Sequence, residues 1–304
     1  MTKKVMVLMG GFSSEREVSL NSGKAVAAAL KQKGYDVIEH DLTDSRKLIE
    51  VLNKEKPDVV FNALHGNWGE DGTIPALLDL LQIPYTHSGL TASCVGMNKY
   101  LTKLIAEKAN IKTAFGRKMT AREFITIGAT VARPFVVKPV SDGSSVGVFI
   151  VEKPEDIFKI RYDDPTTELI VEKYIPGQEL TVMCYQGKAH VVTEMKAKEG
   201  FYDYQNKYTS GKTMHIIPAN IPDDVAKLCL SYAETIHNKL GCKTVSRSDF
   251  RYNPEDGVVF LEINTHPGMT DLSLVPEQAK YIGVSYEDLC ASLVEEAQCR
   301  PLSK

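Results

Sequence analysis

The chain has 304 residues, of which 43% are hydrophobic and 25% are charged. This composition is typical of a globular protein with a full hydrophobic core, and the length predicts two or three domains. The net charge of −3 gives no support for non-specific nucleic-acid binding, which requires a surplus of basic residues.

The first 95 residues alternate between strand and helix patterns. Such alternation predicts a parallel sheet covered by helices, with functional loops along one edge. The loops GGFSSERE (10–17) and HGNWGEDG (65–72) directly follow predicted strands and are candidates for that edge. The expected strands lie at 4–9, 35–42 and 57–64, and the expected helices at 13–34, 45–56 and 74–82.

After residue 95 the pattern changes to a small α+β unit with antiparallel strands, followed by two hairpins. We therefore expect an α/β fold that is α+β in its C-terminal two-thirds, with domains at 1–95, 96–177 and 178–304. Strands are expected within 133–151 and at 167–175, helices at 97–111, 154–163 and 223–241, and hairpins within 176–197 and 244–264.

No segment of the sequence predicts an export signal or a membrane anchor. The N-terminal apolar run ends at a glycine pair and is too short for a signal peptide, and no stretch approaches the ~18 apolar residues of a membrane span. The six cysteines show neither CxxC spacing nor a Cys/His cluster, so we expect them to be reduced. We therefore expect a soluble, cytoplasmic protein that does not bind membranes.

The segment VVFLEINTHPGMTDLSLVP (258–276) begins as a strand but carries polar residues inside its apolar run. Glu262 and Asn264 are two residues apart, so they project from one face of this strand. An uncompensated carboxylate in a core costs several kcal/mol, so Glu262 requires a partner. Upstream, the turn signal NPEDG predicts a hairpin with a four-residue loop at 254–257. The pairs expected in this register are Asn253 with Val258, Asp249 with Glu262, and Arg247 with Asn264.

This hairpin face has the chemistry of a magnesium site. Two carboxylates and an amide oxygen are hard donors that suit Mg²⁺, with waters and phosphate oxygens completing the shell. Asp249 and Glu262 would repel each other unless a cation lay between them. The guanidinium of Arg247 could bind a phosphate or a developing oxyanion. The alternative is a solvated polar edge with a simple Arg247–Asp249 ion pair.

The segment VVKPVSDGSSVG (136–147) has the composition of a phosphate-binding loop. Lys138 stands at a strand end, and the glycines at 143 and 147 free the backbone to aim N–H groups at an anion. Ser144 and Ser145 add hydroxyl donors, although the Walker A and GxGxxG patterns are absent and an ordinary hairpin loop remains the alternative.

The next strand, in LIVEKYIPGQE (169–179), carries charged residues along an edge. A strand edge can hydrogen-bond adenine through its backbone, and a carboxylate can hold ribose hydroxyls. Glu172, Lys173 and Glu179 are therefore candidates for nucleotide binding, although the same residues also suit a surface strand.

Seven segments in this order resemble the ATP-grasp enzymes and, within them, the D-alanine–D-alanine ligases. The resemblance covers the whole chain and implies an N-terminal parallel-sheet domain, a small central α+β domain and a C-terminal mixed-sheet domain. It rests on GGFSSEREVSLNSG, ALHGNWGEDGTIPALLD, KPVSDGSSVG, VEKYIPGQELTV, FYDYQNKY, SRSDF and LEINTHPGMTDLSLVP.

The resemblance implies roles for individual residues in binding ATP and metal. Lys99 and Lys138 would contact the phosphates, and the loop 141–147, with Ser144 and Ser145, would close over them. Adenine and ribose would be bound by Glu172, Lys173, Ile175 and Glu179. Two Mg²⁺ (or Mn²⁺) ions would be held by Asp249, Glu262 and Asn264, with Glu262 bridging them.

The same resemblance assigns residues to two D-alanine molecules. Glu15 would pair with the ammonium of the first, with His65 nearby. Arg247 and the backbone N–H of Gly268 would bind the oxyanion. The carboxylate of the second would be received by Ser273, Leu274 and Lys207, the last also at the nucleotide. The lid would be closed by Tyr208, linked to Glu15 through Ser144.

Several of these residues also have ordinary structural interpretations. Ser14 with Glu17 makes a helix capping box, and Glu15 in the first helical turn suits the helix macrodipole. His65 suits a turn, the segment SLVP suits a helix N-terminus, and the tyrosines of FYDYQNKY suit a surface aromatic patch.

The activity implied is ATP-dependent ligation of two D-alanines through an acyl phosphate, for peptidoglycan synthesis, by a homodimer. One alternative is a D-alanine–D-lactate ligase, but such relatives lack the FYDYQNKY lid, so Tyr208 favours the dipeptide enzyme. A second is a nucleotide-binding sensor, which would have no use for Arg247 as an oxyanion donor. A nicotinamide dehydrogenase would need a glycine fingerprint that is absent.

Overall fold

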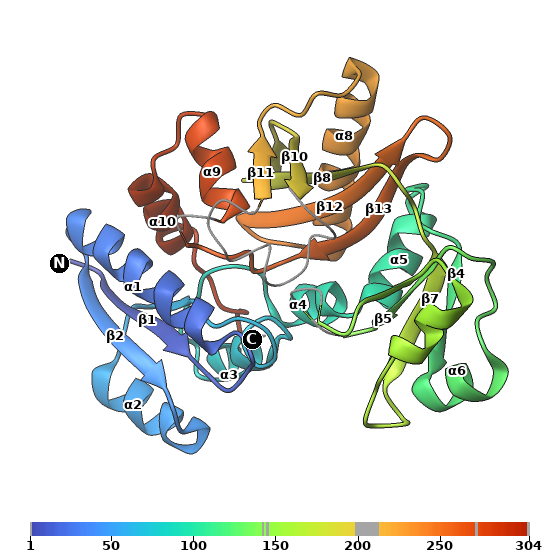
Figure 1. Cartoon of the computed structure of the whole chain (residues 1–304). Coiled ribbons are helices and arrows are strands. Elements are labelled where there is room, and N and C mark those ends of the chain that lie inside the picture. Colours follow the sequence, from blue (N-terminus) through green and yellow to red (C-terminus); the bar gives the residue numbers. More distant parts are fainter. Residues whose placement is uncertain (1, 142, 144–145, 198–212, 271–272, 303–304) are drawn as a thin grey trace.

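The chain folds around three β-sheets (Figure 1). The computed structural model describes residues 2–141, 143, 146–197, 213–270 and 273–302. In Figure 1 the first sheet lies at the left in blue, the second at the right in green, and the third above them in yellow and orange. None of the helices among these residues is both long and apolar enough to cross a membrane.

The first sheet is parallel, as the sequence predicts. β1 lies between β2 and β3, and its residues alternate between two cores on opposite faces of the sheet. Val5 and Val7 pack with α1, whereas Met6 and Leu8 pack with α2 and α3. The elements are β1 (Lys4–Gly10), α1 (Arg16–Gln32), β2 (Asp36–Leu42), a 3₁₀ turn (Ser45–Lys47), α2 (Leu48–Glu55), β3 (Val59–Asn62) and α3 (Thr73–Leu80).

The second sheet is antiparallel, with strand order β4-β7-β5-β6. The segment 154–163, expected to be helical, forms only a 3₁₀ turn (Pro154–Lys159). The sequence analysis missed α4, β4 and α6. The elements are α4 (Leu90–Met97), α5 (Lys99–Lys108), β4 (Gly116–Thr120), α6 (Ala121–Ile127), β5 (Phe135–Pro139), β6 (Phe149–Val151) and β7 (Glu168–Lys173).

The third sheet has the path β11-β10-β8-β12-β13, with β9 paired to β8. Each strand pair described in it is antiparallel, and an isolated parallel bridge joins Thr113 to Phe260 in β13. One face packs against α8, where Phe250 meets Cys229 and Ile236 in one buried cluster. The elements are β8 (Gln178–Tyr185), β9 (Lys188–Ala189), β10 (Thr193–Ala197), β11 (Thr213–Ile216), α8 (Asp223–Leu240), β12 (Val245–Asn253) and β13 (Gly257–Asn264).

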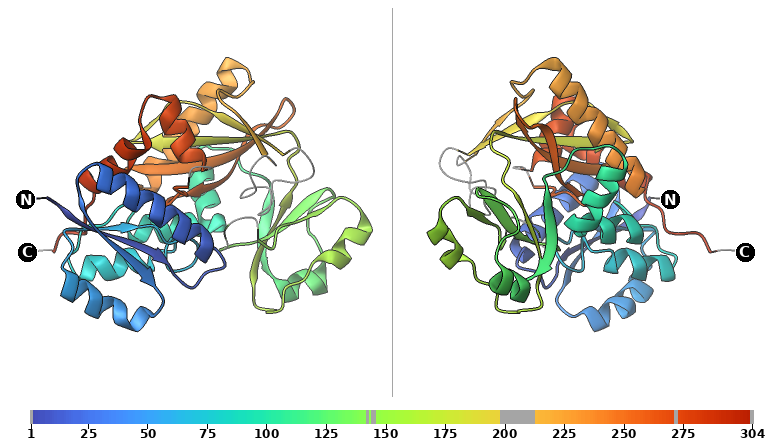
Figure 2. Two further views of the ribbon diagram at one scale, coloured as in Figure 1. Left: turned by 60° about the vertical axis from the view of Figure 1, so that its left-hand side comes forward. Right: turned by 90° about the vertical axis from the view of Figure 1, so that its right-hand side faces the viewer.

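The last two helices return to the first sheet (Figure 2). α9 (Leu274–Tyr281) and α10 (Tyr286–Glu295) follow β13, and Leu289 and Leu293 of α10 share a core with β1 and α1. An ion pair at 2.6 Å joins Lys3, just before β1, to Glu295 at the end of α10. The N-terminal core is therefore completed by C-terminal residues, and our division at residues 95 and 178 stays a prediction.

The β12–β13 hairpin has the predicted side-chain pairs but not the predicted loop. Asn253 faces Gly257 rather than Val258, so the loop has one residue fewer than expected. A register shift follows between Asp249 and Phe250, where one additional β13 residue is accommodated. Because this bulge offsets the shorter loop, Asp249 still faces Glu262, and Arg247 still faces Asn264.

Candidate active site

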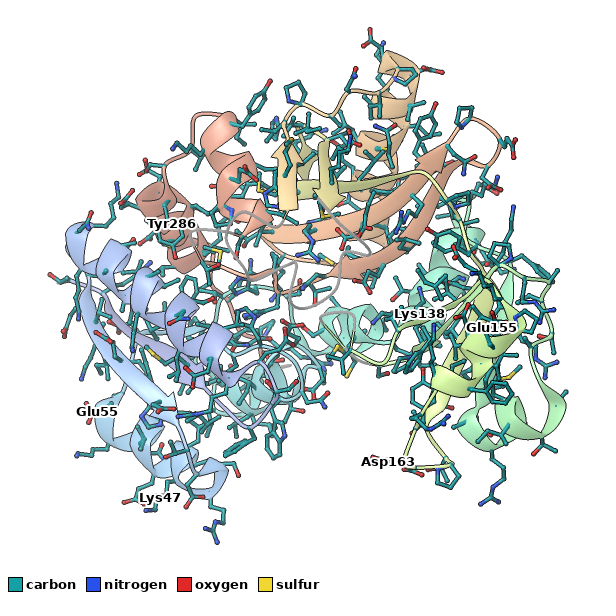
Figure 3. All side chains as sticks on the ribbon, viewed as in Figure 1. Lys47, Glu55, Lys138, Glu155, Asp163 and Tyr286 are labelled. Atoms are coloured by element: carbon teal, nitrogen blue, oxygen red, sulfur yellow. The ribbon has the colours of Figure 1, made fainter. Side chains whose placement is uncertain are left out.

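One cavity lies between the second sheet and the β12–β13 hairpin, and its lining combines residues from both. Figure 3 shows Lys138 on the part of the second sheet that is nearest to this hairpin. Lysines come from α5, β5 and β7, and carboxylates come from β7 and from the third sheet, which also supplies Arg251. The predicted nucleotide and metal residues in the lining are Lys99, Lys138, Glu172, Lys173, Ile175, Glu179, Asp249 and Glu262.

The three predicted metal ligands lie together on β12 and β13, where Asp249 and Glu262 line the cavity. Asp249 Oδ1 and Oδ2 accept hydrogen bonds from Arg247 Nε and Nη2 at 3.0 and 2.8 Å. Asp249 Oδ1 also accepts one from the hydroxyl of Thr181 at 2.6 Å. The simple Arg–Asp pair, which the sequence left as an alternative, is thus present together with the carboxylate cluster.

The second carboxylate of this group is neutralised by a residue from the opposite side of the cavity. Lys99 Nζ lies 3.3 Å from Glu262 Oε2, and the backbone N–H of Lys99 donates to the carbonyl of Val140 at the end of β5. Asn264 Oδ1 accepts from the backbone N–H of His266 at 2.8 Å. Two facing carboxylates with an amide oxygen fit a divalent cation, because they offer the hard oxygen ligands that such a cation prefers. Each carboxylate is also paired with a basic side chain, and that side chain could instead face a phosphate.

Glu172, one of the predicted adenine residues, is buried between two lysines. Lys138 Nζ contacts Glu172 Oε1 at 2.7 Å, and Lys103 Nζ donates to Oε2 and also to the carbonyl of Ala114. Burial opposes ionisation of Glu172, but the charges of Lys138 and Lys103 lower its pKa below the ordinary value. Burial lowers the pKa of Lys103. The cluster carries two potential positive charges for one negative, which suits a polyphosphate nearby.

The other predicted nucleotide residues lie along the connection from β7 to β8. Ile175 is buried, and Glu179 lies at the start of β8. The ammonium of Lys173 pairs with Asp256 Oδ1 at 2.7 Å, which ties this connection to the β12–β13 turn. Lys173 therefore has an additional structural contact that the sequence did not indicate.

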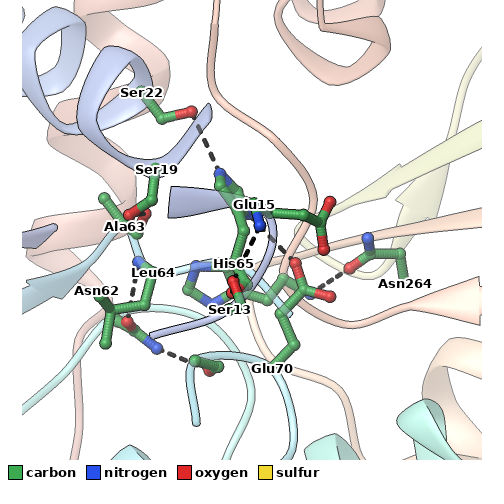
Figure 4. A network of polar contacts seen from close by, with 12 residues as sticks. Ser13, Glu15, Ser19, Ser22, Asn62, Ala63, Leu64, His65, Glu70 and Asn264 are labelled. Carbon is green, nitrogen blue, oxygen red and sulfur yellow. Dashed lines mark hydrogen bonds and ion pairs between the residues drawn. The ribbon is translucent and has the colours of Figure 1, made fainter. Parts of the chain in front are cut away.

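The predicted site for the first D-alanine is built on the loops after β1 and β3 (Figure 4). Glu15 is 7% exposed and is the N-cap residue of α1, but it makes no side-chain cap hydrogen bond, so the predicted Ser14–Glu17 capping box is not formed. The Ser13 hydroxyl instead accepts from the Glu15 N–H and donates to the carbonyl of His65. A Cβ added to Gly66 or Gly143 would lie 3.0 or 3.1 Å from Glu15 Oε2.

His65 uses both ring nitrogens within the protein. Nε2 lies 3.1 Å from the Ser22 hydroxyl, and Nδ1 lies 3.1 Å from Glu70 Oε1. Its ring is 5.9 Å from that of His266, which in turn lies 3.9 Å from the ring of His87. Burial lowers the pKa of His87 to about 3, so this ring is neutral at ordinary pH. The ring contacts join the end of β13 to the loop that carries His65.

The predicted oxyanion donor and second D-alanine site are also neighbours. A Cβ added to Gly268 would lie 3.0 Å from Ser273 Oγ, so this position leaves little space for a side chain. Ser273 is the N-cap residue of α9, where Leu274 begins the helix, and its hydroxyl accepts from the Thr270 N–H at 3.0 Å. Ser144, Ser145, Lys207 and Tyr208 lie outside the described residues.

The sequence analysis missed three polar residues in or beside the cavity. Lys103 donates a hydrogen bond to Glu172 but is not itself part of the cavity lining, whereas Arg251 and Tyr174 line the cavity. Arg251 follows Arg247 and Asp249 on alternate positions of the same strand, so the period of two that indicated the metal face could have found it. Nothing in the local pattern distinguishes Lys103 from a surface lysine of an amphipathic helix.

A cavity between two antiparallel sheets, lined by lysines from one side and by carboxylates from both, is the arrangement of an ATP-grasp enzyme. The comparisons identify which one. A family model described as "D-ala D-ala ligase C-terminus" matches residues 108–295, and "D-ala D-ala ligase N-terminus" matches residues 4–55 and 45–88. This chain therefore belongs to the D-alanine–D-alanine ligase family.

Individual relatives agree with the family models. A D-alanine–D-alanine ligase of Zymomonas mobilis is 50% identical over 97% of this chain and 94% of its own length. A D-alanine–D-alanine ligase of Wolbachia pipientis is 45% identical over 98% of this chain and 95% of its own length. The crystal structure of the Bacillus anthracis ligase complexed with ATP has a TM-score of 0.83, 30% identity and 97% coverage of each chain. The VanG D-Ala:D-Ser ligase of Enterococcus faecalis has a TM-score of 0.79, 28% identity and coverage of 97% and 99%.

Proposed function

We propose that this chain joins two D-alanine molecules at the expense of ATP and supplies the dipeptide for peptidoglycan synthesis. The observation that carries this proposal is the cavity in which Lys99 and Lys138 face Asp249 and Glu262. The named relatives support it, as does the ATP complex of the Bacillus anthracis ligase.

The reaction needs a carboxylate converted into an electrophile. A carboxylate oxygen of the first D-alanine attacks the γ-phosphorus of ATP, the bond to ADP breaks, and an acyl phosphate forms. The amine of the second D-alanine, having lost its extra proton, then attacks the acyl carbon and phosphate leaves. The products are D-alanyl-D-alanine, ADP and phosphate. Positioning and charge neutralisation supply most of the rate enhancement in such transfers.

Two Mg²⁺ (or Mn²⁺) ions belong to this proposal. Asp249, Glu262 and Asn264 would hold them, with Glu262 between the two. When bound, the ions would neutralise charge on the β- and γ-phosphates. Lys99 pairs with Glu262 and Arg247 pairs with Asp249, so each of these proposed ligands has a basic side chain beside it.

The remaining nucleotide contacts follow from the cavity lining. Lys99 and Lys138 would donate to phosphate oxygens, and Ser144 and Ser145 would add donors from the loop. Glu172, Lys173 and Ile175 would lie along adenine, and Glu179 would hold the ribose. Because Lys103 stays on Glu172, the carboxylate keeps one partner when Lys138 turns to the nucleotide.

The two amino-acid sites complete the proposal. Glu15, supported by His65, would pair with the ammonium of the first D-alanine. Arg247 and the Gly268 N–H would stabilise the tetrahedral oxyanion, a kind of interaction worth about 3–4 kcal/mol per donor elsewhere. The second carboxylate would be received by Ser273, Leu274 and Lys207. Tyr208, through Ser144, would close the site and exclude water from the acyl phosphate.

We also propose a homodimer and a cytoplasmic location. The cytoplasm supplies ATP, and the six cysteines are unpaired by disulfides, consistent with a reducing compartment. Gel filtration with light scattering tests the dimer, because a monomer would elute with a mass of 33.7 kDa.

The activity is tested by coupled ADP detection across D- and L-amino acids, with and without Mg²⁺. We expect ADP release that requires both D-alanine and Mg²⁺; nucleotide binding without turnover would instead indicate a sensor. Supplying D-alanine together with D-lactate or D-serine near neutral pH, with mass spectrometry of the product, decides between ligase types. A depsipeptide as the main product would overturn the dipeptide assignment.

A further inference from the structure

The pairing of β8 with β12 places an arginine directly opposite the proposed ribose carboxylate. Arg251 and Glu179 are register partners in this antiparallel pair, so their side chains project from the same face of the sheet. Both side chains line the nucleotide cavity. Their proximity is therefore fixed by the backbone and does not depend on a mobile surface contact.

The Arg251 guanidinium is held by contacts on several sides. Nη2 lies 2.9 Å from Glu179 Oε2, and Nη1 donates to the carbonyl of Gly177 at 3.1 Å. The guanidinium carbon lies 5.9 Å from the centre of the Tyr174 ring, within the range of a cation–π contact. The side chains of Arg251 and Glu179 are only 12% and 15% exposed. An ion pair this restricted keeps one geometry better than an exposed pair does.

The geometry of this pair suits a carboxylate that must also receive sugar hydroxyls. A carboxylate can accept about four hydrogen bonds, so an ion pair through Oε2 is compatible with further donors on Glu179. An arginine remains charged at all relevant pH values, so its attraction for the Glu179 carboxylate persists and helps to keep that carboxylate oriented. A neutral residue at 251 would leave Glu179 held by fewer contacts and free to adopt other rotamers.

We propose that Arg251 is a positioning residue that holds the Glu179 carboxylate against the ribose and so sets the preference of the enzyme for ribonucleotides over deoxyribonucleotides. This inference rests on the proposed role of Glu179 at the ribose. The ligand feature it concerns is the pair of 2′- and 3′-hydroxyls, not the phosphates or the reacting atoms. Arg251 acts on the nucleotide through Glu179.

The experiment compares the full-length protein with its Arg251→Met variant, which keeps a long side chain without the charge. Steady-state kcat and KM are measured for ATP, 2′-deoxy-ATP and 3′-deoxy-ATP at saturating D-alanine and Mg²⁺. We expect KM for ATP to rise about tenfold with kcat within about twofold, as for loss of one charged hydrogen-bonding contact. For the deoxynucleotide that lacks the hydroxyl bound by Glu179, KM should change by less than about twofold.

Two further variants separate the possible outcomes. Arg251→Lys keeps a charge but loses the planar fork, and we expect it to recover part of the discrimination; it also carries the test if Arg251→Met does not fold. Glu179→Gln should abolish the preference for ATP over one deoxynucleotide. An equal rise in KM for all three nucleotides in the Arg251 variants would overturn the inference. A normal preference in Glu179→Gln would overturn the proposed role of Glu179 itself.

Discussion

Two arginine–carboxylate pairs involve β12, and the two pairs differ in geometry. In the first pair Arg247 donates to both carboxylate oxygens of Asp249, which lies two residues along the same strand. In the second pair Arg251 reaches across to Glu179 on the neighbouring strand, and it also donates to the carbonyl of Gly177. In the proposed reaction Asp249 must receive a metal ion and Arg247 an oxyanion, so the first pair exchanges partners. The second pair keeps its partners throughout.

The largest effect is expected at the exchanging pair. Arg247→Ala should lower kcat by about 100-fold or more, because it removes a donor that acts on the developing oxyanion. The KM for ATP should change far less, since Arg247 does not line the nucleotide cavity. The measurement is steady-state ADP release with purified variants.

A matched control for Arg247 is Arg46→Ala. Arg46 also pairs with an aspartate two residues away, Asp44, but its side chain is 88% exposed and remote from the cavity lining. We expect unchanged kcat for this control. An Arg247→Ala enzyme with the kcat of the control would remove Arg247 from the mechanism and make its pair with Asp249 merely structural.

The next largest effect is expected for the carboxylate that faces Asp249. Glu262→Gln keeps the shape of the side chain but removes one charge from the metal cluster. We expect the Mg²⁺ concentration for half-maximal activity to rise about tenfold or more, because affinity follows the number of charged ligands. A Mg²⁺ titration of ADP release measures this. An unchanged Mg²⁺ requirement would place the metal ions elsewhere.

A smaller effect, on the stability of the fold, is expected when the contact of Lys103 with Glu172 is removed. Lys103→Met leaves the buried Glu172 with Lys138 as its remaining lysine partner. We expect the free energy of unfolding to fall by about 1 kcal/mol, measured by urea denaturation. In the Lys103→Met/Glu172→Gln double variant the second change should cost less than it does alone, because the two residues are coupled. Strictly additive losses would show that Lys103 does not stabilise Glu172.

The smallest expected effect is the pH dependence of the contribution that Glu172 makes to stability. Because the pKa of Glu172 is lowered in the folded protein, its contribution is complete above the ordinary glutamate pKa of 4.5 and is lost as pH falls through the folded value. The difference in unfolding free energy between the wild type and Glu172→Gln should therefore shrink as the solution is acidified below pH 4.5. A difference that grows on acidification would reverse the sign assigned to this pKa shift.

Much of the fold follows from period and alternation. The strands of the first sheet and the long helix α8 were predicted within a few residues, because their apolar positions repeat with a clear period. α4 was missed because its sequence, LTASCVGM, consists mostly of small residues without an apolar stripe. β4 was missed because GRKMT is short, charged and exposed for three of its five residues.

The pairing of Asp249 with Glu262 could be predicted from alternation within one hairpin, but two errors in the predicted hairpin cancelled each other. The predicted loop was one residue too long, and the bulge beside Asp249 restored the expected pairs. The contact of Lys103 with Glu172 was less predictable, because these two residues meet only when α5 packs beside the second sheet. Contacts between elements distant in sequence leave no periodic signal within either element.

The core shared by β1, α1 and α10 has a consequence for synthesis of the protein. Val5 and Val7 leave the ribosome nearly three hundred residues before Leu293, with which they share a buried cluster. Until α10 is synthesised, this apolar surface has α1 as a cover but lacks the contribution of α10, so part of it is available to chaperones or to other nascent chains. We infer that the N-terminal unit reaches its native packing only after α10 has left the ribosome, and that a stop codon shortly before α10 would yield an aggregating product.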